Sequence, residues 1–159
     1  MPRLFLLRHG IADSDGADPP LSQAGALRMA KEAAGMAALG LTFDLILTSP
    51  LRRAQQTARI VADRLGLGKA VRVCQEAGPG CRLSEVAPVL GRCGDSVARV
   101  LVVGHQPDMG RLAADLVGAR EPFGFGRGTL ACLESATWPP AVPCGMLFLI
   151  PGEALERIG

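Results

Sequence analysis

LFLLRHG, residues 4–10, places an uninterrupted apolar run directly before an arginine, a histidine and a glycine. A continuous apolar run of this kind is typical of a strand buried on both faces of a parallel sheet. The same arrangement occurs twice more along the chain. A short apolar strand at 43–47 precedes TSPLRR (48–53), and an apolar run at 100–103 precedes GHQPD (104–108). The sequence therefore predicts three buried strands, each followed at once by a polar cluster.

Helical segments are expected between these strands. Ser22 can cap a helix that stops at Gly40. We predict Ser49 and Pro50 as the N-cap and first position of a second helix, because the missing N–H of proline costs nothing there, and Gly66 ends this helix. The other expected elements are strands at 70–73, 129–133 and 146–150, a short helix at 83–90, and a helix from Pro107 to Gly118.

This alternation of strand and helix favours an α/β fold. We expect a three-layer sandwich, with a mostly parallel central sheet and helices on both faces. At 159 residues the chain has the length of one domain, so a single domain is predicted over residues 1–159.

The composition of the chain excludes several other classes of protein. Apolar residues make up 48% and charged residues 20%, which favours a globular protein over a disordered one. The net charge is only +2 and no run of Lys or Arg concentrates it, so we expect no nucleic-acid partner. No secretory signal and no window of transmembrane length is visible, which predicts a cytoplasmic protein without membrane attachment.

The cysteines favour the same compartment. They number five and show no Cys-x-x-Cys spacing, so we expect reduced thiols rather than a disulfide framework or a zinc site. No apolar stripe is left over for a subunit interface, and a monomer is therefore expected.

The three polar clusters are expected to meet in space. The carboxyl ends of parallel strands lie at one edge of a sheet, where ligand crevices open. Topology therefore brings together His9 and His105, the only two histidines of the chain, with Arg8 and the Arg52-Arg53 pair.

This set of side chains suits a phosphoryl group. Arginine presents a planar fork of donors that matches phosphate oxygens, and helix N-termini after Ser49 and Gln106 add backbone N–H groups. Neighbouring guanidinium groups disfavour the protonated form of a histidine, so a nucleophilic imidazole is available at neutral pH. Gly10 allows backbone or substrate to come close to His9.

Each feature alone has a plainer explanation. An Arg-His-Gly triplet is often a surface loop, and Arg52 and Arg53 could be solvated residues of a first helical turn. His9, His105 and Asp108 could also hold a metal, although no two of them have the close helical spacing of zinc hydrolases. The occurrence of all three clusters at successive strand ends favours the functional interpretation.

The motifs resemble those of the histidine phosphatase superfamily, also called the phosphoglycerate-mutase-like family. The resemblance is carried by LRHG (7–10), PLSQAG (20–25), TSPLRRAQQTA (48–58) and VGH (103–105). Within the family, the short length, GHQPD (104–108), and the late Gly145-Met146-Leu147 and Pro151-Gly152 are similar to the SixA-type phosphohistidine phosphatase branch.

The resemblance implies a role for each site residue. His9 corresponds to the nucleophile that becomes phosphorylated and is then hydrolysed, and His105 to the second histidine, which stabilises the transferred phosphoryl group. Arg8 and Arg53 correspond to the phosphate-binding arginines; Arg53 is preferred to Arg52 because it directly precedes Ala-x-Gln-Thr-Ala. Gly10 and Ser49 are expected to contribute to substrate binding. The family uses no metal, and no cofactor is implied.

One part of the family pattern is not matched. Larger members carry a glutamate as general acid between the second helix and the strand of the second histidine, and here only Glu76 and Glu85 are available without a matching pattern. The sequence therefore predicts a metal-independent phosphatase of phosphohistidine on proteins. A phosphomonoesterase acting on a small phosphate ester and a non-catalytic phosphate-binding module are the alternatives.

Overall fold

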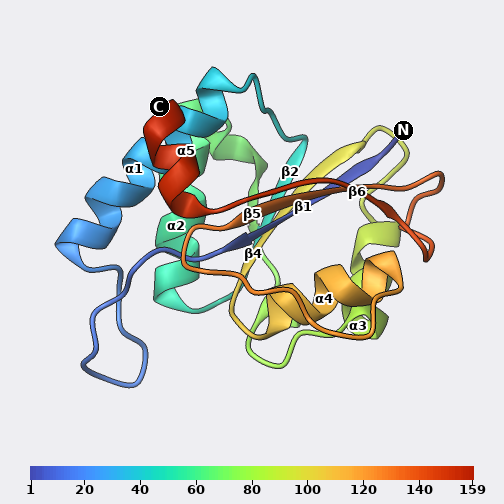
Figure 1. Cartoon of the computed structure of the whole chain (residues 1–159), viewed down its shortest axis with the longest axis horizontal. Helices are drawn as coiled ribbons and strands as arrows, with labels where there is room; N and C mark the ends of the chain where they lie inside the picture. The colour runs from blue at the N-terminus through green and yellow to red at the C-terminus, as the bar shows by residue number, and fades with distance from the viewer.

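A six-stranded sheet runs through the centre of the computed structural model, which describes residues 1–159 (Figure 1). Its strands are β1 (Arg3–Arg8), β2 (Leu45–Thr48), β3 (Val71–Val73), β4 (Arg99–Gly104), β5 (Leu130–Glu134) and β6 (Gly145–Ile150). The strand order is β3-β2-β4-β1-β5-β6. Strands β1 to β4 pair in parallel, and β5 runs antiparallel to both of its neighbours. The mostly parallel sheet is confirmed.

Five helices cover the two faces of this sheet. They are α1 (Gln23–Ala38), α2 (Arg52–Leu65), α3 (Leu83–Gly91), α4 (Asp108–Val117) and α5 (Gly152–Ile158). Helices α1, α2 and α5 contribute buried residues to the core on one face, and α3 and α4 contribute to the core on the other. The two groups lie on opposite sides of the strands in Figure 1, as a three-layer α/β sandwich requires.

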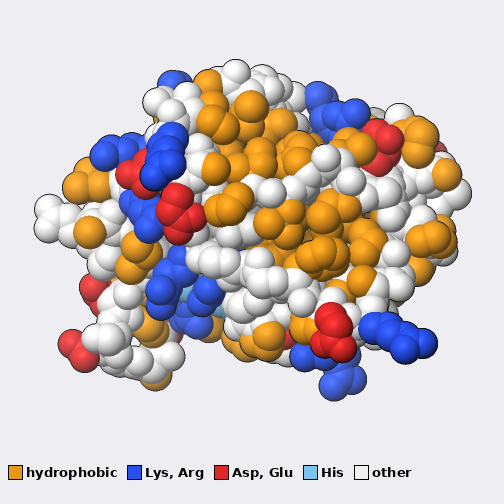
Figure 2. Space-filling view, viewed as in Figure 1, with side chains coloured by type: hydrophobic (Ala, Val, Ile, Leu, Met, Phe, Trp, Pro, Cys, Tyr) orange, Lys and Arg blue, Asp and Glu red, His pale blue; other side chains and the backbone are white.

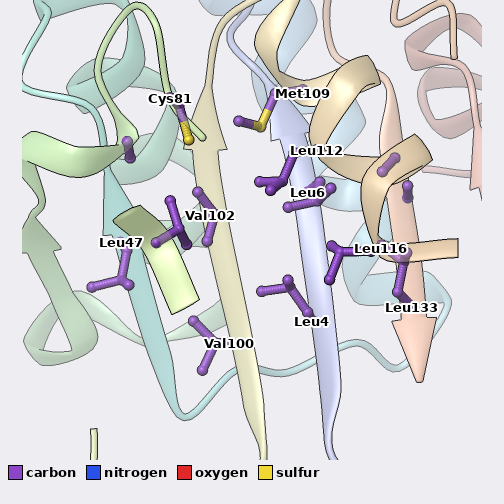
Figure 3. Close-up of a cluster of buried hydrophobic side chains, with 14 of the residues drawn as sticks. Leu4, Leu6, Leu47, Cys81, Val100, Val102, Met109, Leu112, Leu116 and Leu133 are labelled. Atoms are coloured by element: carbon purple, nitrogen blue, oxygen red, sulfur yellow. The ribbon is translucent and has the colours of Figure 1, made fainter. Parts of the chain in front are cut away.

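Strand β1 is buried on both faces, as its apolar run predicts. Leu4 and Leu6 belong to the core beneath α3 and α4, whereas Phe5 and Leu7 belong to the core beneath α1, α2 and α5. Figure 3 shows Leu6 beside the α4 side chain of Leu112, with Leu4 further along β1 on the same face. Each such leucine stabilises the fold by about 1.5–3 kcal/mol through burial. This central strand ends at the polar cluster that begins with Arg8.

The start of helix α2 differs from the prediction. Its N-cap is Leu51, not Ser49, and Leu51 provides no side-chain hydrogen bond. The Ser49 hydroxyl lies 2.7 Å from His105 Nε2 and accepts a hydrogen bond from the backbone N–H of Leu51. The backbone N–H of Arg52, the first helical residue, donates instead to the carboxylate of Asp18, 3.0 Å away. A cap from a distant loop thus replaces the expected local one.

Helix α5 is an element that the sequence does not predict. Its seven residues are too few for an apolar period to be recognised. The helix is fixed by packing against α1: Leu155 is fully buried, and a Cβ on Gly35 would overlap the carbonyl group of Leu155.

Two further observations concern the chain as a whole. None of the helices combines the length and apolar character needed to cross a lipid bilayer. The five cysteines are free thiols, and burial raises the pKa of Cys81 to about 12 and that of Cys132 to about 11. Thiols with such pKa values are poor nucleophiles at neutral pH.

Candidate active site

The ends of β1, β2 and β4 bring the three polar clusters together. Leu7 and Thr48 both pair with Val103 of β4, so the residues that follow these strands are neighbours. The backbone continues the connection, because His9 N–H donates to the Gly104 carbonyl at 3.0 Å and Ser49 N–H donates to the Val103 carbonyl at 2.9 Å. The predicted gathering of the clusters at one sheet edge is therefore observed.

His9 is held in one orientation by its own loop. Its side chain is buried, and Nδ1 lies 2.7 Å from the carbonyl oxygen of Gly10. A carbonyl oxygen only accepts hydrogen bonds, so Nδ1 carries the proton and Nε2 of the neutral ring keeps its lone pair. An imidazole with a fixed tautomer and an unprotonated Nε2 is the arrangement that a nucleophilic histidine needs.

Arg53 lies against this Nε2 atom. Its Nε–H donates to His9 Nε2 at 3.2 Å, and its side chain is only 20% exposed. Thr57, one turn further along α2, accepts a hydrogen bond from the Gly10 N–H at 3.1 Å and donates to the Arg53 carbonyl at 2.8 Å. The preceding residue, Arg52, is exposed, and its side chain forms no hydrogen bond or ion pair. Of the two neighbouring arginines, the structure brings Arg53 to His9.

His105 faces His9 across the site, with ring centroids 5.2 Å apart. Its Nε2 forms a hydrogen bond with the Ser49 hydroxyl, at 2.7 Å from Oγ. Its Nδ1 is buried and has no hydrogen-bond partner in the protein. Ser49, a predicted substrate-binding residue, is fully buried, and the hydrogen bond from its hydroxyl orients the His105 ring.

Arg8 completes the cluster. One of its terminal nitrogens, Nη1, donates to the Phe125 carbonyl at 2.9 Å, while its Nε is buried without a partner. Burial, and then the positive charges of Arg127 and Arg53, lower the pKa of Arg8 below its usual value. A buried polar atom without a partner is costly, and an anion in the site would relieve that cost at the guanidinium N–H of Arg8.

The electrostatics of the site keep both histidines neutral. Burial lowers the pKa of His9 to about 4, and the nearby His105, Arg53 and Arg8 act in the same direction against the bond to the Gly10 carbonyl. Burial followed by Arg53 and Arg8 likewise lowers the pKa of His105 to about 4. Figure 2 shows basic side chains gathered around the place where histidine reaches this face. The site is therefore a positively charged cluster with two neutral imidazoles.

We expect both histidines to titrate with midpoints near pH 4, well below the ordinary value of about 6.5. Because the chain has only two histidines, the ring C2–H protons give two NMR signals that can be followed across pH. Arg53→Ala should raise both midpoints, since one cause of the lowered pKa is removed. Midpoints above pH 6 in the wild-type protein would contradict this description of the site.

The remaining candidates are placed away from these contacts. Glu76 and Glu85 line a cavity of about 610 Å³ together with the loop 78–81, and no hydrogen bond or ion pair connects either of them to the site histidines or arginines. Asp108 accepts a hydrogen bond from the backbone N–H of Gly80 at 2.8 Å. No group of three or more His, Cys, Asp or Glu side chains is arranged to hold a metal ion.

Gly10, the residue after His9, lies close to side chains of the neighbouring elements. A Cβ built on it would lie 3.2 Å from Met29 Cε and 3.3 Å from Leu21 Cδ2. The glycine therefore accommodates close packing against the start of α1 and the residues before it.

Two residues of the site environment were not predicted. Thr57 lies within TSPLRRAQQTA (48–58), but its two hydrogen bonds depend on how α2 packs beneath the His9 loop. Asp18 belongs to a loop whose polar composition, rich in Asp and Pro, indicates only exposure. No local pattern distinguishes Asp18 from Asp13 or Asp15.

Comparison with known proteins places these features in a family. Residues 4–76 match the model of the histidine phosphatase superfamily, branch 1. An uncharacterized protein of Picosynechococcus sp. is 40% identical over 116 residues, which cover 69% of this chain and 70% of that protein. Phosphohistidine phosphatase SixA of Escherichia coli K12 is 31% identical over 133 residues, which cover 81% and 83%. A structure of the protein histidine phosphatase SixA complexed with tungstate matches with a TM-score of 0.86 and 27% identity, covering 96% of this chain and 99% of that one.

Proposed function

The chain belongs to the histidine phosphatase superfamily and is a phosphatase of the SixA type, and we propose that it removes the phosphoryl group from phosphohistidine on proteins without a metal ion. In this proposal His9 is the nucleophile, Arg8 and Arg53 bind the phosphoryl oxygens, and His105 stabilises the charge that develops on them.

The observation that carries the proposal is the contrast between the two histidines. His9 has its Nδ1 tied to the Gly10 carbonyl and its Nε2 free for attack, apart from the hydrogen bond from Arg53. His105 has its Nε2 tied to Ser49 and its Nδ1 buried without a partner. One ring therefore offers a nucleophilic lone pair, and the other offers a buried polar atom for a phosphoryl oxygen.

In the first step, the Nε2 lone pair of His9 forms a bond to phosphorus as the bond from phosphorus to the substrate nitrogen breaks. The bonding electrons stay with that nitrogen, and the substrate histidine leaves as a neutral imidazole because its distal nitrogen carries a proton. Arg8, Arg53 and His105 stabilise the negative charge spread over the equatorial oxygens.

In the second step, water attacks phosphorus and His9 is released. The hydrogen bond from His9 Nδ1–H to the Gly10 carbonyl oxygen, with 2.7 Å between nitrogen and oxygen, keeps a proton on the ring of the phosphorylated enzyme. His9 therefore also departs as a neutral imidazole. Inorganic phosphate is the product. Neither step needs a metal ion, because guanidinium groups supply the positive charge.

The choice of phosphohistidine follows from the leaving group. An alcohol expelled from a phosphate ester leaves as an alkoxide, whose conjugate acid has a pKa near that of water, about 15.7, and it needs a positioned acid. The imidazole of phosphohistidine has a pKa of about 6.5 and departs without one. Neither Glu76 nor Glu85 forms a hydrogen bond or an ion pair with the site residues, which supports a substrate that requires no acid.

We therefore expect kcat/KM for a phosphohistidine protein or peptide to exceed that for phosphoserine by at least about a hundredfold, the scale of lost acid catalysis. Aryl phosphates with acidic phenol leaving groups should lie between the two. The measurement is a panel of initial rates for phosphohistidine protein, phosphoserine peptide, a sugar phosphate and a chromogenic aryl phosphate, each with and without chelator.

The panel separates the alternatives. Similar rates on phosphoserine or a sugar phosphate would contradict the proposal and indicate a phosphomonoesterase with an unrecognised acid, for which Glu76→Gln is the first variant to test. Loss of activity in chelator, restored by a divalent ion, would indicate a metal hydrolase. No turnover of any substrate, with retained binding, would indicate a phosphate-binding module.

A further inference from the structure

Asp18 is a carboxylate at the edge of a site built for an anion. Its Oδ1 accepts a hydrogen bond from the backbone N–H of Arg52 at 3.0 Å and lies 3.9 Å from Arg53 Nη1. A negative charge in this place opposes phosphate binding, so we expect the Asp18 carboxylate to have a role other than contact with the phosphoryl group. We propose that Asp18 is the positioning residue of Arg53, holding the guanidinium group against His9; the inference rests on the proposed function.

The two phosphate-facing arginines are anchored in different ways. Arg8 donates through Nη1 to the Phe125 carbonyl at 2.9 Å, which leaves its Nε free. Arg53 has no such carbonyl; its Nε donates to His9, and its Nη1 forms an ion pair with Asp18 Oδ1 at 3.9 Å. Arginine has a long flexible stem, so a guanidinium group without an anchor does not keep one orientation.

Asp18 is itself held in place. The loop that carries it is closed by a hydrogen bond from Asp13 N–H to the Pro20 carbonyl at 2.9 Å and by a β-bridge between Ala12 and Leu21. The bond to Arg52 N–H then attaches the loop to the first turn of α2. One oxygen atom of Asp18 thus caps the helix start and lies at ion-pair distance from the side chain of the next residue, Arg53.

These contacts predict that Asp18 acts through Arg53 and not by touching substrate. When Nε2 of His9 bonds to phosphorus, Arg53 Nε must give up its present hydrogen bond to that atom. Asp18 remains at the far side of the guanidinium group and keeps it directed at the phosphoryl oxygens. The contribution of Asp18 should therefore disappear when Arg53 is removed.

Asp18→Asn separates this role from helix capping. Asparagine still accepts a hydrogen bond from Arg52 N–H and is a good cap, but it has no charge to hold Arg53. We expect kcat to fall about tenfold, with KM changed less than twofold and the melting temperature unchanged, because a misaligned catalytic group slows the step after binding. Asp15→Asn is the matched control, since Asp15 is an exposed residue of the same loop without a hydrogen bond or ion pair.

A double-mutant cycle tests the dependence on Arg53. Asp18→Asn added to Arg53→Ala should reduce kcat less than twofold further. In the free enzyme, the NMR signal of Arg53 Nε–H should change from that of an ordered group to that of a mobile one in Asp18→Asn. This last readout does not need turnover, so it tests Asp18 even if phosphohistidine is not the substrate.

Three results would overturn the inference. The first is a kcat for Asp18→Asn within twofold of the wild-type value. The second is a fall in kcat that is equally large when Asp18→Asn is added to Arg53→Ala. The third is an Arg53 Nε–H group that stays as ordered in Asp18→Asn as in the wild-type protein.

Discussion

Replacing His9 with alanine is expected to abolish turnover and the phosphorylated enzyme together, with a loss of rate of at least about a thousandfold. The substitution removes the only imidazole of the site whose Nε2 is free of a serine partner. Brief reaction with labelled phosphohistidine substrate, followed by denaturation, should leave acid-labile, base-stable phosphate on the wild-type protein and none on His9→Ala.

His105→Ala is the matched control for this experiment. It removes the other histidine while leaving the His9 ring tied to Gly10, so slow labelling at His9 should remain. Label that persists in His9→Ala, or that maps to His105 in the wild-type protein, would mean that His105 and not His9 is the nucleophile. The experiment thus decides which histidine carries the phosphoryl group.

The sequence alone could not make this distinction from first principles. Both histidines follow buried strands, and both lie beside glycine. The structure separates them by their partners, a backbone carbonyl for His9 Nδ1 and the Ser49 hydroxyl for His105 Nε2. From sequence, only the resemblance to the histidine phosphatase superfamily distinguishes His9 as the nucleophile.

The features predicted from sequence are those that depend on short-range signals. Apolar runs identify β1 and β4 because these strands are buried on both faces, and Gly66 and Gly118 end helices in the left-handed conformation that glycine adopts readily. The meeting of His9, Arg53 and His105 was also predicted, because parallel strands place their carboxyl ends at one edge.

The features that were missed depend on contacts between distant segments. The cap of α2 comes from Asp18, 34 positions away from Arg52, and takes the place of the local serine. The anchor of Arg8 is a backbone carbonyl at Phe125, and a carbonyl group has no signature in sequence. Ser49 looked like a cap because its residue type and the following proline suit one, but the neighbouring His105 uses its hydroxyl.

Arg53→Ala and Arg52→Ala form the sharpest pair of variants on this chain. Both remove one positive charge from the same helical turn, so the long-range electrostatic loss is nearly equal. Only Arg53 contacts His9 Nε2, at 3.2 Å. We expect Arg53→Ala to lower kcat/KM by about a hundredfold or more, the usual effect of losing one charge-stabilising donor, worth roughly 3 kcal/mol. Arg52→Ala should lower kcat/KM by less than about twofold.

The two variants also test how the helix start is built. Arg52 contributes its backbone N–H to Asp18, and alanine keeps that group, so Arg52→Ala should leave the melting temperature within the range of surface substitutions. Steady-state kinetics on a phosphohistidine substrate and on an aryl phosphate would measure both losses. A large loss of kcat/KM for Arg52→Ala, together with a small loss for Arg53→Ala, would mean that the helix turns by one residue when phosphate binds. The hydrogen bond between Arg53 and His9 would then belong only to the free enzyme.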